Sequence, residues 1–140
     1  LSFLLIFYAA WAVIFAPITP VIAGSPIWLG QVLLVLGAGN HLFHYLLLRR
    51  RVLSLARPDA LVTSVGLFRW VRHPMYLGDL IMMIGAALMA RDLAGAIGLI
   101  IFVFLIVFLI FDEEQMMENK FGEVFQQWQT RTKRLIPWLF

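Results

Sequence analysis

Charged residues are absent from two long stretches of this chain, and their segregation restricts the possible fold more than any other feature. Residues 1–48 and 93–111 contain no Lys, Arg, Asp or Glu. An apolar stretch of roughly 18 or more residues without charge is typical of a transmembrane helix. Hydrophobic residues make up 62% of the 140 positions, and a soluble domain of this size could not bury so much apolar surface. The chain is therefore predicted to be an integral membrane protein.

The rest of the composition excludes several other classes of protein. The chain has no cysteine, which excludes a disulfide framework and a metal site built from thiolates. Its formal net charge of +3 does not indicate a nucleic-acid partner, because the basic residues stand at the ends of apolar segments, where membrane proteins anchor to the interface. We predict no nucleic-acid partner and no metal site, and the sequence indicates no protein partner.

The pattern predicts an all-α, polytopic membrane protein with about four transmembrane helices in a single domain. Two N-terminal spans are expected within residues 1–50, a cytoplasmic connector at 51–72, a helical hairpin at 73–111 and a cytoplasmic or interfacial tail at 112–140. The last span is expected to end near Phe111. In the tail, apolar residues recur at helical spacing, as an amphipathic helix requires; they are Met117, Phe121, Val124, Phe125 and Trp128. Such a helix either lies in the membrane interface or packs on the cytosolic loops of the protein itself.

The basic residues also predict the orientation. Six arginines belong to the connector region and three basic residues to the tail, namely Arg49, Arg50, Arg51, Arg57, Arg69 and Arg72, then Arg131, Lys133 and Arg134. With four spans these two regions share one side, and the positive-inside rule makes that side cytoplasmic. Both termini are then expected to be cytoplasmic.

The hairpin is expected to bring two polar segments together at the cytoplasmic side. Its two helices have similar lengths and a very short turn at Arg91 and Asp92, so residues 72–76 should lie beside residues 112–114. A helix N-terminus suits an anionic group, the carboxylates suit a cation, and the rings of Phe68 and Tyr76 also favour a cation. A zwitterion with a further positive charge would fit. The alternative is an interfacial salt-bridge cluster between Arg72 and the acids.

Two sequence blocks in this region resemble a known superfamily. Residues 72–78 (RHPMYLG) resemble the RHPxYxG signature of the isoprenylcysteine carboxyl methyltransferase and phospholipid methyltransferase superfamily. The second block resembles its acidic, FG and RxxRxIP pattern, through Glu113 and Glu114, Phe121 and Gly122, and then Arg131, Arg134 and Pro137. The resemblance covers roughly residues 57–138, and the two blocks occur in order on either side of an apolar hairpin.

The resemblance implies an integral-membrane enzyme that uses S-adenosylmethionine and methylates a lipophilic small molecule or a membrane lipid delivered through the bilayer. By motif position, the cofactor contacts would be His73, Pro74, Met75 and Tyr76, with Glu113 holding the amino group and Leu61, Val62 and Phe68 lining the adenosine region. If the methyl acceptor is an amine, Glu114 or His73 could take its proton. Leu109 replaces an arginine of the prenylcysteine enzymes, which disfavours a prenylcysteine carboxylate as substrate.

Polar residues in the second span leave other interpretations open. Asn40, His41 and His44 lie within an apolar segment, where polar side chains are costly and often functional. Asn40 and His44 share a helix face and would either bind substrate or form hydrogen bonds between helices. His41 or His44 could instead ligate a haem in a redox subunit, and a non-catalytic scaffold is a further alternative. Asp79 is expected to pair with a neighbouring arginine or to face the same pocket.

Overall fold

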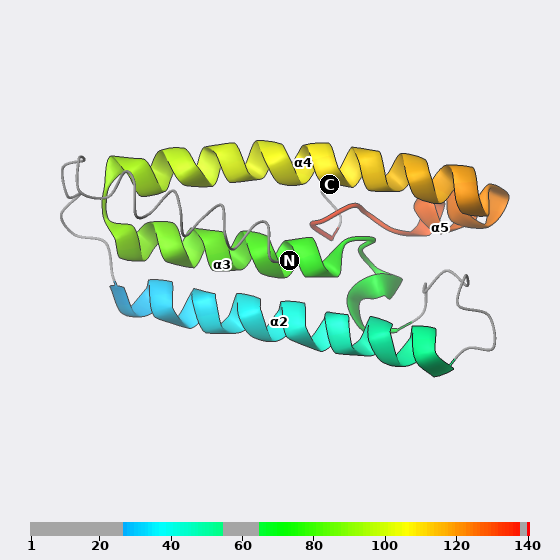
Figure 1. Cartoon of the computed structure of the whole chain (residues 1–140), viewed down its shortest axis with the longest axis horizontal. Helices are drawn as coiled ribbons and strands as arrows, with labels where there is room; N and C mark the ends of the chain where they lie inside the picture. Colours follow the sequence, from blue (N-terminus) through cyan, green and yellow to red (C-terminus); the bar gives the residue numbers. More distant parts are fainter. Residues whose placement is uncertain (1–26, 55–64, 138–139) are drawn as a thin grey trace.

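Three long helices lie side by side in the computed structural model, which describes residues 27–54, 65–137 and 140 (Figure 1). The helices are α2 (Ile27–Ser54), the 3-10 helix η2 (Gly66–Arg69), α3 (Pro74–Ala90), α4 (Leu93–Phe121) and α5 (Glu123–Arg131). Helix α3 lies between α2 and α4, and the chain after α5 turns back toward the start of α3 (Figure 1). The all-helical prediction is confirmed over these residues. The predicted span within residues 1–23 lies outside them.

Two of the described helices are long and apolar enough to cross a membrane, by length and composition. They comprise Ile27–Arg50 of α2 and Leu93–Phe121 of α4, whereas α3 is an apolar helix of 17 residues. At about 1.5 Å per residue, α3 is roughly 25 Å long. Large apolar side chains of α2 and α4 stand outward, including Val35, Phe104 and Phe108, which are 67%, 73% and 69% exposed. An outward apolar surface of this kind suits lipid rather than water.

The predicted hairpin of α3 and α4 is confirmed. Helix α3 begins at Pro74, whose missing N–H group would have no partner in the first turn in any case. Arg91 ends the helix in the left-handed conformation with φ of 58°. Asp92 then starts α4, because its side chain accepts a hydrogen bond from the Gly95 N–H at 2.6 Å. These local signals reverse the chain within two residues.

Glycines allow α2 and α3 to approach until their backbones touch. A Cβ atom on Gly37 would lie 2.5 Å from the Gly78 carbonyl oxygen, and one on Gly85 would lie 2.6 Å from the Gly30 oxygen. Small residues at such positions let apolar helices pack closely without a hydrophobic driving force between them. Gly39 of α2 is exposed, and a Cβ there would meet nothing within 4 Å.

The contrast between two of these glycines yields a prediction. Gly37→Ala should destabilise the protein by about 1–3 kcal/mol, the usual cost of overpacking a tight contact, because the new methyl group meets the Gly78 carbonyl. Gly39→Ala, on the exposed face of the same helix, should leave stability unchanged or slightly raise it. Thermal unfolding in detergent measures both. Equal destabilisation by the two variants would contradict the proposed helix contact.

Helix α4 continues well past Phe111, so the expectation that the last span ends its helix near that residue is wrong. Residues 112–121 contain Glu, Gln, Met and Lys and no Gly or Pro, and these residue types favour helix. The helix stops only at Gly122, which has φ of 51°. The uncharged stretch that begins at residue 93 ends at Phe111. Residues 112–121 of α4 therefore extend beyond the apolar segment.

The amphipathic stripe of the tail is divided between two helices. Met117 and Phe121 belong to the end of α4, while Phe125 and Trp128 belong to α5 and pack in a cluster with Phe68. Phe125 is fully buried. This packing favours the interpretation in which the stripe contacts the protein's own loops rather than lipid.

Candidate active site

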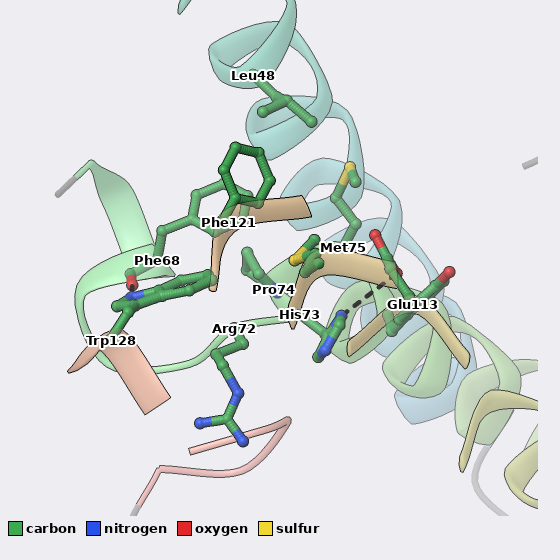
Figure 2. Close-up of a pocket in the computed structure, with 11 residues that line it drawn as sticks. Leu48, Phe68, Arg72, His73, Pro74, Met75, Glu113, Phe121 and Trp128 are labelled. Atoms are coloured by element: carbon green, nitrogen blue, oxygen red, sulfur yellow. Dashed lines mark hydrogen bonds and ion pairs between the residues drawn. The ribbon is translucent and has the colours of Figure 1, made fainter. Parts of the chain in front are cut away.

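A cavity of about 160 Å³ lies where α3 begins and α4 passes it. Six of the eight residues predicted to contact a cofactor line it, namely Phe68, His73, Pro74, Met75, Tyr76 and Glu113 (Figure 2). The other two, Leu61 and Val62, lie outside the residues that the structure describes. The segments that contribute these six residues are distant in sequence, and the hairpin brings them together as predicted.

His73 joins the two sides of the cavity. Its Nδ1 lies 3.5 Å from Oε2 of Glu113, the contact drawn as a dashed line in Figure 2. On the other side of the ring, the buried Nε2 lies 3.4 Å from Oε1 of Glu114 without forming a hydrogen bond. The ring stacks on Tyr76, with centroids 5.6 Å apart. The prediction that the residues at the start of α3 lie beside Glu113 and Glu114 is therefore confirmed.

The two carboxylates favour the charged form of the imidazole. Burial by itself lowers the pKa of His73, but interactions with Glu113 and Glu114 outweigh it, so the pKa is raised above its ordinary value. The protonated form of the ring is therefore stabilised where it lies between the two acids.

The neighbouring acids Glu113 and Glu114 face different surroundings. Glu114 is buried and bonded to two guanidinium groups, with Arg72 Nε 2.7 Å from Oε1 and Arg134 Nε 2.9 Å from Oε2. The Glu113 side chain is 33% exposed and lines the cavity. The salt-bridge cluster predicted as the alternative therefore exists, and it involves Glu114. Glu113 remains available to a ligand.

The C-terminal segment holds the backbone that carries His73. The N–H groups of Arg72 and His73 donate to the carbonyl oxygens of Lys133 and Arg134 at 2.8 and 3.0 Å. Figure 2 shows the Arg72 side chain directed toward this segment, where its Nη1 donates to the Thr132 carbonyl at 2.6 Å. The segment matches the second sequence block, so the two blocks of the resemblance touch each other.

The cavity has five further lining residues that the predicted cofactor contacts did not include, namely Leu48, Arg72, Met117, Phe121 and Trp128. Three of them belong to the amphipathic stripe, so their periodicity was visible in the sequence but the surface they cover was not. Trp128 is fixed by its indole N–H, which donates to the Phe68 carbonyl at 3.1 Å. Leu48 is the last residue of the uncharged stretch 1–48, and no sequence signal distinguishes it from its apolar neighbours.

Asn40 and His44 do not line this cavity but hold the backbone next to it. Asn40 Nδ2 donates to the Pro74 carbonyl at 2.6 Å. His44 Nδ1 lies 2.9 Å from the Asn40 carbonyl, and its Nε2 accepts from the Leu67 N–H at 3.1 Å. These contacts favour hydrogen bonding between helices over contact with substrate. They also occupy both ring nitrogens of His44, so the haem alternative gains no support from this residue.

Asp79 pairs with a histidine rather than with an arginine. Its Oδ1 lies 2.8 Å from Nδ1 of His41, and both residues are buried between α2 and α3. The expected arginine partner is therefore wrong, because the Gly37–Gly78 contact brings His41 to Asp79 first. The pair also engages His41 in a role other than haem ligation.

Two helices long and apolar enough to cross a membrane, and a cavity at the start of α3 that His73 and Glu113 line, suit a helical membrane protein. The family model described as "Phospholipid methyltransferase" matches residues 22–124. The chain belongs to the phospholipid methyltransferase family, which is part of the integral-membrane methyltransferase superfamily. No curated protein and no solved structure matches the chain.

Proposed function

We propose that this chain transfers the methyl group of S-adenosylmethionine to a membrane lipid or another lipophilic small molecule. The observation that supports this most directly is the cavity itself, where Glu113 and His73 meet at the head of an apolar hairpin. Family membership indicates a membrane methyltransferase. The identity of the methyl donor and the class of the methyl acceptor go beyond family membership, and they are what this proposal adds.

The charges around the cavity suit the amino-acid end of such a donor. The Glu113 carboxylate would hold an ammonium group, and the first turn of α3 presents N–H groups suited to a carboxylate. The rings of Phe68 and Tyr76 favour the positive sulfonium. At about 160 Å³ the cavity is smaller than the roughly 300–1,000 Å³ of a complete ligand pocket. It would therefore hold one end of the donor, with Leu61 and Val62 of the connector lining the adenosine end.

The reaction itself requires little beyond alignment. A sulfonium donor supplies an electrophilic methyl group, and positioning of the two reactants provides much of the rate enhancement. Apolar walls from Met75, Met117 and Phe121 would exclude competing water. An amine acceptor would first have to lose a proton. Glu114 is bonded to Arg72 and Arg134, and the two acids favour the protonated form of His73, which disfavours both groups as the acceptor of that proton.

The proposed topology places this cavity at the cytoplasmic face of a single domain with four spans and with both termini cytoplasmic. Among the described residues, the basic side chains gather at the cavity end of the helices, and Arg91 alone stands at the opposite turn. The positive-inside rule assigns the richer end to the cytoplasm, where the methyl donor is made. Helix α5 would lie at the level of the headgroups.

The proposal is tested by transfer of a labelled methyl group. Purified protein is incubated with methyl-labelled S-adenosylmethionine and a total membrane lipid extract, and the labelled product is separated and identified. We expect label in the lipid fraction, at a rate that depends on protein concentration. Protein that binds S-adenosylhomocysteine but labels neither lipids nor other lipophilic metabolites would contradict the catalytic role and favour the scaffold interpretation.

A further inference from the structure

A second hollow lies at the same end of the molecule, beside the C-terminal segment. It encloses about 220 Å³, and its walls include Trp70, Thr130, Arg131 and Lys133. The hollow does not share a lining residue with the cavity of Glu113. The hollow is therefore a separate site that the proposed methyl transfer does not use.

The charge of this hollow is positive. Arg131 and Lys133 are exposed and form no ion pair with any residue in the described part of the chain. No acidic side chain lines the hollow. Two basic residues that line one concave surface suit a phosphate group, which Arg and Lys bind through several donors at once.

The hollow also lies at the level where lipid headgroups are expected. The guanidinium of Arg134, next to Lys133, stands 4.6 Å from the ring of Phe111, the last residue of the uncharged stretch. Trp70 in the wall of the hollow is 54% exposed, and exposed tryptophan is enriched at the membrane–water interface. A phosphate at this depth would belong to a lipid.

We propose that this hollow binds the phosphate headgroup of an anionic membrane phospholipid. Lys133 and Arg131 contact the phosphate, while Trp70 packs beside the glycerol and the start of the acyl chains. Basic pockets on the cytoplasmic side of membrane helices are known to accept such headgroups. The site is distinct from the cavity proposed for methyl transfer, since neither Glu113 nor His73 lines it.

The test measures binding of a fluorescent short-chain phosphatidylglycerol to the intact protein in detergent. Arg131→Gln together with Lys133→Gln should weaken binding about 25-fold, or about fivefold per cation, the size of a typical contact between a basic residue and an anionic membrane. The backbone bonds of Lys133 do not depend on its side chain, so the double variant should fold. Equal melting temperatures verify this.

Three comparisons make the outcome decisive. Lys120→Gln removes an exposed charge that does not line the hollow, and it should change binding less than twofold. A zwitterionic short-chain phosphatidylcholine should bind more weakly than phosphatidylglycerol, and inorganic phosphate at the same concentration should not displace the lipid. A loss from Lys120→Gln as large as the loss of about fivefold expected for each cation of the hollow would reduce the effect to general charge attraction and overturn the site. Displacement by inorganic phosphate would overturn its assignment to a lipid.

Discussion

Glu113→Gln is expected to weaken binding of S-adenosylhomocysteine about 100-fold, which is the usual scale for removing one partner of a desolvated charge pair. The variant keeps the size of the side chain and removes only its charge. Because the Glu113 carboxylate is 33% exposed and contacts His73 at 3.5 Å, the melting temperature should stay close to that of the wild type. Calorimetric titration with S-adenosylhomocysteine measures the affinity.

The matched control for this variant is the preceding residue. Asp112→Asn removes the same charge one position away, from an exposed side chain that does not line the cavity. It should bind the ligand within about twofold of the wild type, as expected for screened surface charges. Wild-type affinity in Glu113→Gln, or an equal loss in both variants, would refute the assignment of Glu113 to the donor's amino group.

Glu114→Gln should instead destabilise the fold, by about 3–5 kcal/mol, the typical cost of leaving a buried charge without its partner. Glu114 is bonded to Arg72 at 2.7 Å and to Arg134 at 2.9 Å, and Arg72 is itself buried. The amide cannot balance either guanidinium. Thermal unfolding in detergent measures the effect.

Two further variants separate this role from a general loss of charge. Glu118→Gln alters an exposed acid whose partner is Gln126, and it should cost less than about 1 kcal/mol, as surface interactions do. Replacing Arg72 together with Glu114, as in Arg72→Met with Glu114→Leu, should recover part of the stability, because the buried Arg72 guanidinium is no longer left without its carboxylate. A melting temperature of Glu114→Gln equal to that of Glu118→Gln would contradict the buried network.

These three consecutive acids show what helical periodicity determines and what it leaves open. Each residue of an α-helix is rotated by about 100° from the one before, so Asp112, Glu113 and Glu114 must point in different directions. Helical periodicity does not predict which of the three side chains points to solvent, which to the cavity and which to Arg72. That assignment depends on how α4 packs against α3 and against the C-terminal segment, and the structure supplies it.

Several elements of this protein were predictable from the sequence by itself, because they depend on short-range physics. The uncharged stretches predict apolar helices, Pro74 and the Arg91–Asp92 turn predict the hairpin, and the hairpin predicts that residue 73 meets residue 113. Six residues of the predicted cofactor site then share one cavity. The first span and the positions of Leu61 and Val62 stay predictions.

Only the tertiary structure decided which polar groups pair. It showed Asp79 bonded to His41, Asn40 and His44 bonded to the backbone beside the cavity, and the C-terminal segment bonded to Arg72. The physical reason is that apolar periodicity and charge segregation act within one helix, whereas the partner of a buried polar group is chosen by which neighbouring helix approaches closest. Here the glycines that let α2 and α3 touch bring Asp79 to His41.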